Sequence, residues 1–398
     1  MKSTKPLKLA SCTIVLFFLT MVCKAQQQFT YNQGGIVNKD YYEEIPYETA
    51  NGKMFITVKI GGKKRKFLFD TGAPAQITYE LYNKLKPPVI KYVNATDANG
   101  RKDSVDVVSI PEFKLNFIEF KNIPAVLSNS EIYQCWGIDG VLGSNLFYNS
   151  IIRIEADKHR IIITNDDKKL SLANREHTDL ITDATQGYPN VVVLLTQPKK
   201  QTFIAGFDTG DADFLIMTET DMKRFERLNA FKKQSKGYGS GHIGFFGLQK
   251  SDSTYRIKFP SVNIGGVTFN NVTTETNNSN LTRLGTKILD YGTVTLDFIH
   301  HYFYFEPNTS NTDLGEKQWP IQPIISNDKL IVGIVWQKLK DQVKPGDQII
   351  AVGDTSYSTI DLCGAVNGKF SILKDKQSAT LTIKDNKGGI KKINIEKE

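Results

Sequence analysis

The stretches FLFDTG (residues 67–72) and FIAGFDTG (residues 203–210) place the tripeptide Asp-Thr-Gly behind a Phe twice in one chain. Each acid follows an apolar run that predicts a strand, so each carboxylate is expected at a half-buried strand end. A single Asp-Thr-Gly is most simply a turn, because Asp and Gly are both favoured in turns. If the segments around the two copies are also repeated, the copies indicate a duplicated structural unit rather than two unrelated turns.

The segments around the two tripeptides are indeed repeated. Residues 143–163 align without a gap with residues 285–305, and residues 111–123 align in the same way with residues 260–272. In both pairs apolar and polar residues alternate, as in strands that are buried on one face. A repeat of this kind predicts a mainly β fold built from two copies of one unit.

Helical patterning is sparse. The segments 79–85 and 218–231 are the best candidates for helices. The second begins at a plausible N-cap, either Thr218 or Thr220, and carries acidic residues in its first turn.

A duplicated unit brings equivalent loops together at its pseudo-twofold axis, so Asp70 and Asp208 are expected to face each other. Two facing carboxylates about 3 Å apart cannot both ionise and therefore share a proton. One group then acts as an acid and the other as a base at the same pH, which suits activation of a water and protonation of a leaving nitrogen. The hydroxyls of Thr71 and Thr209 can cross-link the two loops.

These features resemble the aspartic peptidases, the group of pepsin and retropepsin. Lobes of that group carry a hydrophobic-hydrophobic-Asp-Thr-Gly loop and, later, a hydrophobic-hydrophobic-Gly turn that braces it. Val141-Leu142-Gly143 matches the brace well, whereas Arg283-Leu284-Gly285 matches it less well. The resemblance implies a two-lobed acid-protease fold with catalytic Asp70 and Asp208. The supporting residues of the catalytic loops and braces would be Thr71, Gly72, Thr209, Gly210, Leu142, Gly143, Leu284 and Gly285.

The residues that follow the two tripeptides depart from the pepsin pattern. Pepsin-like enzymes usually have Ser or Thr there, but this chain has Ala73 and Asp211. In having Ala73 after the first Asp-Thr-Gly, the first unit resembles the bacterial retropepsin-like group. An inward-facing Asp211 would raise the apparent pKa values of the pair, whereas an outward-facing one would only be surface. The neighbouring Asp213 suggests an exposed turn and favours the outward orientation.

The resemblance also implies a β-hairpin flap over the cleft. Residues 93–108 contain two alternating arms around Asn99-Gly100, which is a strong hairpin signal. Residues 236–247, which are rich in Gly and carry Tyr238, hold the equivalent place in the second unit. Two ordinary hairpin loops are the alternative interpretation.

The segment after the second unit is different. Residues 308–318 are polar and rich in turn formers, as in a linker. Within residues 319–398, a Pro-Gly-Asp turn precedes an apolar strand, and this resembles a small bacterial PDZ-like α+β domain. The resemblance implies capture of a peptide by strand addition. The usual carboxylate-binding loop is not clear here, so a purely structural cap is the alternative.

The N-terminal segment has the pattern of a secretory signal. Lys2, Lys5 and Lys8 precede the apolar run 9–22, and cleavage is expected after Ala25. Lipid attachment at Cys23 is the less favoured alternative, because a bulky Val precedes it. No later run is long and apolar enough for a membrane helix. The chain is therefore expected to be periplasmic or secreted, with units at 26–170, 171–308 and 309–398.

Composition gives further limits. The chain has 398 residues and a formal net charge of +8, but no basic run is interleaved with aromatic residues as in a nucleic-acid groove. Cys135 and Cys363 lie far apart, in different units, and are expected to be two buried, inert thiols rather than a disulfide. No spacing of His, Cys and acidic residues is typical of a metal site, so neither a metal nor a cofactor is expected.

These patterns together predict an exported aspartic-type endopeptidase. A water activated between Asp70 and Asp208 would hydrolyse the bonds of an extended peptide or protein substrate, with no nucleic acid involved. The alternative is a catalytically silent peptide-binding protein that keeps the fold. Asp211, the weak brace at Leu284-Gly285 and the unclear carboxylate-binding loop of residues 319–398 slightly favour that alternative.

Overall fold

The computed structural model describes residues 29–368 and 372–398. The predicted signal segment 1–25, including Cys23, lies outside the described residues. Within the described ranges, no helix is long and apolar enough to cross a membrane.

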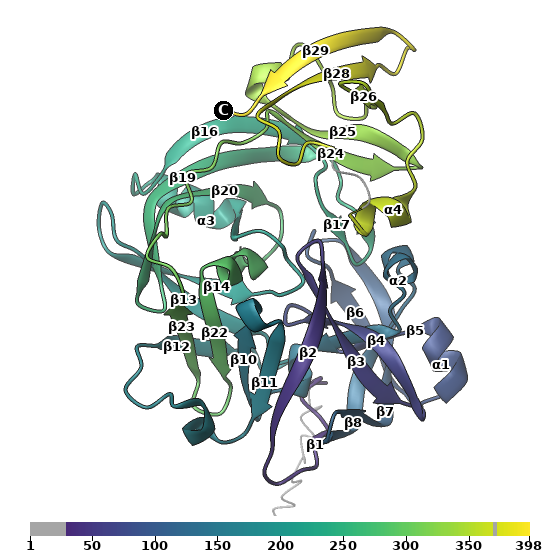
Figure 1. The fold of residues 1–398 in the computed structure, drawn as a ribbon, viewed down its shortest axis with the longest axis vertical. Helices are drawn as coiled ribbons and strands as arrows, with labels where there is room; N and C mark the ends of the chain where they lie inside the picture. Colours follow the sequence, from purple (N-terminus) through teal and green to yellow (C-terminus); the bar gives the residue numbers. More distant parts are fainter. Residues whose placement is uncertain (1–28, 369–371) are drawn as a thin grey trace, which may run out of the picture.

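The fold is mainly β and consists of two lobes side by side with a third, smaller unit above them (Figure 1). This confirms the predicted fold class for the two repeated units. The first lobe contains β1 (Gly35–Ile36), β2 (Tyr42–Ala50), β3 (Lys53–Ile60), β4 (Lys63–Asp70), β5 (Gln76–Thr78), α1 (Tyr79–Leu85), β6 (Val89–Thr96), β7 (Lys102–Leu115), β8 (Ile118–Ser128), α2 (Glu131–Trp136), β9 (Gly140–Gly143), β10 (Ile151–Glu155) and β11 (Arg160–Thr164).

The second lobe repeats most of this order, but it adds the small hairpin of β17 and β18 and has no helix at the place of α2. It contains β12 (Thr178–Thr182), β13 (Pro189–Leu195), β14 (Gln201–Phe207), β15 (Leu215–Thr218), α3 (Glu219–Glu226), β16 (Lys232–Gly239), β17 (Ile243–Gly244), β18 (Gly247–Leu248), β19 (Asp252–Ile264), β20 (Val267–Asn277), β21 (Arg283–Leu284), β22 (Gly292–Asp297) and β23 (Tyr302–Pro307). The C-terminal unit contains β24 (Ile321–Ser326), β25 (Lys329–Trp336), β26 (Gln348–Val352), β27 (Thr355–Ser356), α4 (Leu362–Val366), β28 (Ser378–Lys384) and β29 (Ile390–Glu396).

The two lobes share one sheet, in the order β2-β11-β10-β22-β23-β12. At its centre β10 pairs antiparallel with β22, and Ile152 lies opposite Leu296 while Ile154 lies opposite Val294. In the aligned repeats Ile152 corresponds to Val294 and Ile154 to Leu296. The partners are therefore exchanged, as a twofold axis between the strands requires.

Both predicted helices form where the sequence places them. Thr78 caps α1 and Thr218 caps α3, each through a side-chain oxygen that accepts a backbone N–H. The second helix is shorter than predicted, since α3 ends at Glu226. One hydrophobic core runs through both lobes, and the C-terminal unit has a core of its own around Leu330, Ile349 and Leu381.

The C-terminal unit is joined to both lobes. Its strand β25 extends the sheet of the second lobe by pairing with β16, so Tyr238 lies opposite Val335. On the other side, Cys135 in α2 forms a disulfide with Cys363 in α4. The prediction of two inert thiols is therefore wrong. The sequence reasoning treated distance along the chain as distance in space, whereas the fold brings α2 and α4 together.

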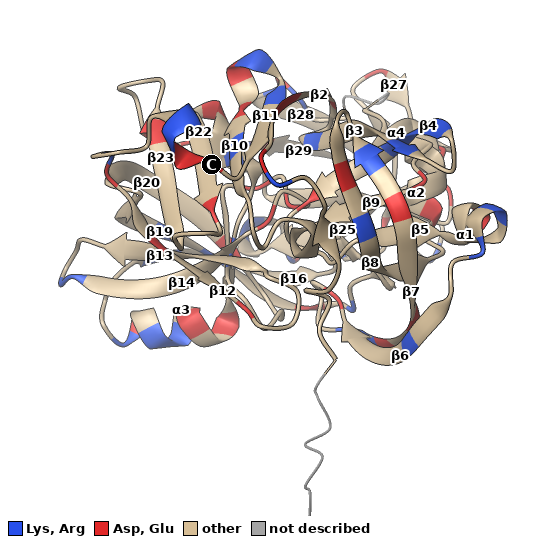
Figure 2. Ribbon diagram, turned by 90° about the horizontal axis from the view of Figure 1, so that it is seen from below, with Lys and Arg blue, Asp and Glu red and all other residues tan. Residues whose placement is uncertain are grey.

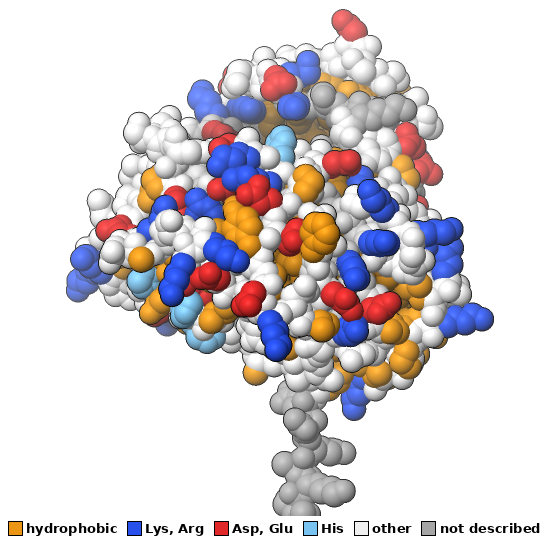
Figure 3. All heavy atoms as spheres, turned by 60° about the horizontal axis from the view of Figure 1, so that its bottom comes forward, with side chains coloured by type: hydrophobic (Ala, Val, Ile, Leu, Met, Phe, Trp, Pro, Cys, Tyr) orange, Lys and Arg blue, Asp and Glu red, His pale blue; other side chains and the backbone are white. Residues whose placement is uncertain are grey.

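The charges of the chain are mixed over the surface. Basic and acidic residues are scattered over the strands, and both kinds lie on α3 (Figure 2). They are also interspersed on the face shown in Figure 3. Part of this mixture is an ion-pair cluster in the shared sheet, where Arg153 binds Glu155 and Glu306. The net charge of +8 therefore does not gather into one patch on these faces.

The junction between β16 and β25 yields a test. Gly239 has φ +140°, and a Cβ there would lie 1.9 Å from the carbonyl oxygen of Gly333. We expect Gly239→Ala to loosen the C-terminal unit, because two backbones would have to separate. Gly62→Ala is the matched control: Gly62 also has positive φ but nothing within 4 Å of the added Cβ. The control should lose only about 1–2 kcal/mol from backbone strain.

Limited proteolysis and thermal unfolding measure this difference. Equal sensitivity of the Gly239→Ala and Gly62→Ala proteins would show that the junction tolerates the methyl group.

Candidate active site

The two Asp-Thr-Gly loops are locked together by reciprocal hydrogen bonds between buried groups. The N–H of Thr71 donates to Oγ1 of Thr209, and the N–H of Thr209 donates to Oγ1 of Thr71, both at 3.0 Å. Each hydroxyl then donates across the axis: Thr71 to the carbonyl of Phe207 at 2.6 Å and Thr209 to that of Phe69 at 3.0 Å. The cross-link expected from the two threonines is present.

The loops carry Asp70 and Asp208 toward each other. Oδ1 of Asp70 accepts the N–H of Gly72 at 2.9 Å, and Oδ1 of Asp208 accepts the N–H of Gly210 at 2.8 Å. Each carboxyl also fills the space beside the glycine of the opposite loop. A Cβ on Gly72 would lie 2.3 Å from Cγ of Asp208, and one on Gly210 would lie 2.5 Å from Oδ2 of Asp70. Only glycine permits this approach.

The two carboxyl groups do not have equal affinities for a proton. Burial, followed by the negative charges of Asp70 and Asp211, raises the pKa of Asp208 to about 8. Burial also raises the pKa of Asp70, but the Lys53 charge and hydrogen bonds from Gly72 and Asp208 oppose that rise. The arrangement therefore holds the shared proton on Asp208 and leaves Asp70 as the hydrogen-bonded base.

The braces lie where the sequence predicted them. Leu142 pairs with Phe69 in the parallel ladder between β4 and β9, and Leu284 pairs with Phe207 in the one between β14 and β21. The N–H of Asp208 donates to the carbonyl of Leu284 at 2.9 Å. The second brace therefore pairs with its loop as the first does, but its ladder has two residue pairs where that of the first has four.

The glycines of both braces allow close contact with the catalytic loops. A Cβ on Gly143 would lie 2.2 Å from the backbone of Pro74, and one on Gly285 would lie 2.3 Å from the carbonyl oxygen of Asp213. A larger residue at either position would push the loop toward the axis.

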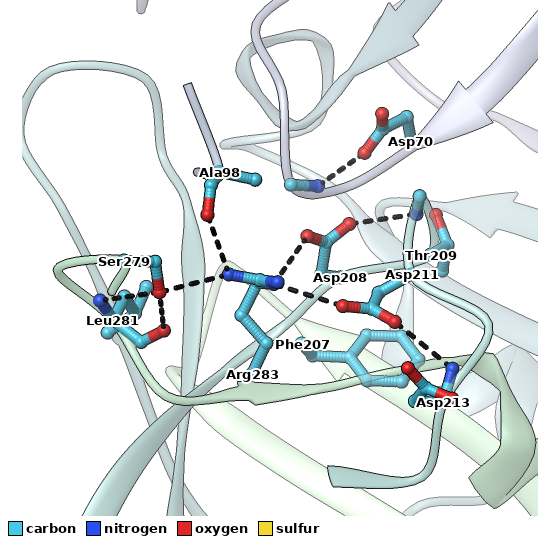
Figure 4. A network of polar contacts seen from close by, with 12 residues as sticks. Asp70, Ala98, Phe207, Asp208, Thr209, Asp211, Asp213, Ser279, Leu281 and Arg283 are labelled. Atoms are coloured by element: carbon cyan, nitrogen blue, oxygen red, sulfur yellow. Dashed lines mark hydrogen bonds and ion pairs between the residues drawn. The ribbon is translucent and has the colours of Figure 1, made fainter. Parts of the chain in front are cut away.

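Asp211 faces inward, which corrects the expected outward orientation. Its Oδ2 forms an ion pair at 3.1 Å with Nε of Arg283, and the same nitrogen lies 3.6 Å from Oδ2 of Asp208 (Figure 4). Burial would raise the pKa of Asp211, but the Arg283 charge outweighs it and the pKa is lowered. Arg283 also donates to Oγ of Ser279 at 3.1 Å and to the carbonyl of Ala98 at 3.5 Å.

Lys53 is a second cation beside the pair. It extends from β3 of the first lobe, and its Nζ donates to the carbonyl of Gly210 in the Asp-Thr-Gly loop of the second lobe. Its charge lowers the pKa values of both Asp70 and Asp208. The buried carboxylates thus have cations from both lobes next to them.

A cavity of about 740 Å³ lies over the two carboxyl groups. Its apolar lining comes largely from the first lobe and from residues 243–246, and it includes Tyr31, Leu68, Val93, Tyr133, Phe245 and Phe246. A space of this size and lining suits apolar side chains of an extended ligand.

The predicted first flap forms as the hairpin of β6 and β7, with its tip at residues 97–101. Asp97 and Ala98 line the cavity, whereas Asn99 and Gly100 line a neighbouring surface pocket. Oδ2 of Asp97 accepts the N–H of Phe246 at 3.0 Å. The tip is thus fastened to the second lobe.

Tyr238 is not a lid residue over the carboxyl pair. It lies in β16 opposite Val335, is 52% exposed and does not line the cavity. The part of the second flap that covers the cavity is the small hairpin of β17 and β18, because Ile243, Phe245 and Phe246 line the cavity.

Two residues of the site were missed in the sequence. Arg283 stands where the first brace has Val141, and this break in an otherwise apolar position was the available signal. Lys53 had no such signal, since only the tertiary structure brings β3 to the opposite catalytic loop. Among the described residues, no three His, Cys, Asp or Glu side chains are grouped as metal ligands.

Residues 56–146 match the family described as Aspartyl protease, a segment that includes the first Asp-Thr-Gly loop and its brace. None of the curated proteins is similar enough to this chain to count as a relative.

Solved structures similar to the chain include the aspartic proteinase from Irpex lacteus, with 10% identity, coverage of 69% of this chain and 99% of that chain, and a TM-score of 0.41. Conglutin gamma, a basic 7S globulin from lupine seeds, has 12% identity, 69% and 96% coverage, and a TM-score of 0.39. A retropepsin-like aspartic protease from Rickettsia conorii has 22% identity, 32% and 96% coverage, and a TM-score of 0.24. These scores are low, so the fold assignment rests on the strand pairings.

The cross-link between the loops can be tested directly. Thr71→Val and Thr209→Val should each lower the free energy of unfolding, because each leaves a buried N–H and a buried C=O unpaired, at about 1–3 kcal/mol for each group. Thr57→Val, at an exposed strand position, is the matched control. Denaturant titration measures the difference, and a loss no greater than that of the control would contradict the role of the threonines.

Proposed function

We propose that this protein is an exported aspartic-type endopeptidase that hydrolyses peptide bonds of extended substrates. One observation carries the proposal: two buried carboxyl groups from symmetry-related loops face each other beneath a cavity of about 740 Å³. Their proton affinities are unequal, as a shared-proton acid and base require. The match of residues 56–146 to the Aspartyl protease family supports the same conclusion.

The residues present account for each proton in the reaction. The Asp70 carboxylate takes a proton from a water, whose oxygen bonds to the peptide carbonyl carbon, while Asp208 gives its proton to the carbonyl oxygen. In the tetrahedral intermediate the C–N bond then breaks as the nitrogen takes the proton from Asp70. One of the two hydroxyl groups on the former carbonyl carbon gives its proton to Asp208. The products, a carboxylic acid and an amine, then leave. The flap tip and the hairpin of β17 and β18 would hold the peptide in an extended form.

The disulfide supports the proposed export. Disulfides persist in oxidising compartments such as the periplasm or the extracellular space. The bond between Cys135 and Cys363 therefore agrees with a signal peptide in residues 1–25. The PDZ-like assignment of residues 319–398, and any peptide bound there, stay predictions.

The second candidate function is peptide binding without catalysis. The observation that favours it is the ion-paired Arg283, whose Nε lies 3.6 Å from Asp208. A cation this close stabilises the ionised form of Asp208 and so opposes the shared-proton state. The charge of Asp211 offsets it, and the pKa of Asp208 is still raised to about 8. The balance therefore favours the peptidase.

Substitution of either acid tests the proposal. Asp70→Asn and Asp208→Asn should each reduce cleavage of a peptide library by about 100-fold or more, because each removes one half of the proton exchange. Asp179→Asn, at an exposed position, should leave the rate unchanged. Full activity in either active-site variant would refute the mechanism.

Stability measurements separate loss of chemistry from loss of folding. The pKa of Asp208 is about 8 in the folded protein and 3.8 in an unperturbed chain. Asp208 therefore favours unfolding increasingly as pH rises from about 4 to about 8. Asp208→Asn removes this effect, so its melting temperature should exceed that of the parent above pH 8 and approach it near pH 4.

The pH profile tests the charges around the pair. Activity should extend through neutral pH and fall above pH 8, where Asp208 loses its proton. Asp211→Asn removes a charge that raises this pKa, so the alkaline limb should move to lower pH. Arg283→Gln removes a charge that lowers it and should move the limb to higher pH. Initial rates measured against pH give both shifts. If the alkaline limb moved in the same direction in both variants, Asp211 and Arg283 would not have opposite effects on the pKa of Asp208.

A further inference from the structure

The cavity above the carboxyl pair is roofed in two layers. The hairpin of β17 and β18 is the inner layer, and Phe245 and Phe246 line the cavity from above. A second cavity of about 520 Å³ is also lined by this hairpin, through residues 243–248. Its lining adds residues 325–328 and Leu362 of the C-terminal unit. The C-terminal unit is therefore the outer layer of the roof.

This outer layer is fastened to both walls of the cleft. On the side of the second lobe, β25 pairs with β16, and the N–H of Ser240 donates to the carbonyl of Gly333 at 3.0 Å. On the side of the first lobe, the disulfide joins α2 to α4. Nδ2 of Asn367 donates to the carbonyl of Cys135 at 2.9 Å, so hydrogen bonding supports the same contact.

The disulfide converts this roof into a closed covalent circle. The cysteines are 228 residues apart, and the chain between them leaves α2 in the wall of the first lobe. It crosses the floor in β10 and passes through the second lobe, where it carries Asp208. After β16 it returns to the shared sheet in β22 and leaves the second lobe along residues 308–320, which bond to Asn270. It then turns over the cleft in the C-terminal unit and reaches α2 at Cys363 (Figure 1).

The first catalytic loop lies against this circle. The N–H of Ser144, a residue of the circle, donates to the carbonyl of Ala73 at 3.0 Å. A peptide placed between Asp70 and Asp208 is therefore surrounded by chain on its floor, walls and roof. A peptide bound between the two carboxyl groups would therefore pass through the circle formed by residues 135–363 and the disulfide.

We propose that the disulfide between Cys135 and Cys363 makes the cleft a covalently closed passage that admits substrates only lengthwise, by a free chain end. This inference rests on the proposed function and specifies its substrates: unstructured chain termini, short peptides and unfolded chains. An internal loop of a folded protein is excluded, because its two ends cannot pass through the circle. Reduction of the disulfide lets α4 separate from α2 and opens the side of the cleft.

Access can be measured as binding, without catalysis. The ligand is a linear peptide selected from a library by binding to the oxidised Asp70→Asn protein, flanked by long Gly/Ser linkers. Four forms are compared: both ends free, a compact folded domain on the N-terminal end, the same domain on the C-terminal end, and domains on both ends. The first three should bind with similar association rates. The fourth should bind at least about tenfold more slowly, because neither capped end can pass through the circle. Only the minor fraction of molecules in which the disulfide has not formed can admit this peptide.

Opening the circle should remove the difference. Cys135→Ser and Cys363→Ser, each in the Asp70→Asn background, should bind the doubly capped peptide about as fast as the singly capped forms. Asn367→Ala is the matched control, since it weakens the same contact but keeps the disulfide. It should still exclude the doubly capped peptide. Alkylation of free thiols followed by mass measurement verifies the redox state of each protein.

Two outcomes would overturn the inference. One is equal binding of singly and doubly capped peptides to the oxidised protein. The other is exclusion of the doubly capped peptide from both Cys→Ser variants. Cleavage of the same peptides by the protein that retains Asp70 is scored separately. Selective binding without any cleavage would refute the peptidase proposal and leave the closed passage intact.

Discussion

The reciprocal hydrogen bonds of Thr71 and Thr209 are the constraint on which the rest of the site depends. Each residue satisfies a backbone N–H and a backbone C=O of the other lobe, with every polar group buried. Because the exchange is symmetric, it fixes the axis, and the axis fixes the positions of Asp70 and Asp208. The same axis runs through the shared sheet, where β10 and β22 exchange equivalent partners.

Electrostatic balance is the second feature of the site. Asp70, Asp208 and Asp211 bring three carboxyl groups together at the base of the cavity, and Lys53 and Arg283 bring cations from both lobes. The two cations lower the pKa of Asp208, but burial and the charges of Asp70 and Asp211 outweigh them. The pKa of Asp208 is therefore still raised to about 8. Arg283 also donates to the carbonyl of Ala98 at the flap tip, so one side chain contacts both the flap and Asp208.

The C-terminal unit gives the site its surroundings. It does not contribute a carboxylate, yet it extends the sheet of the second lobe and is bonded covalently to the first. Its position above the hairpin of β17 and β18 places it in the roof of the cleft. A unit with a separate core thus lies beside the hairpin that covers a site formed by the other two units.

The sequence by itself determined the repeated β units, both Asp-Thr-Gly loops, their braces, the first hairpin and the capped helices, because these follow from local patterns: strand alternation, turn residues and a repeat in register. Only the tertiary structure decided the disulfide, the inward orientation of Asp211 and the roles of Lys53 and Arg283. It also decided that Tyr238 lies in a strand rather than over the cleft. Each of these depends on which distant segments meet in space, and the spacing of residues along the chain carries no information about that.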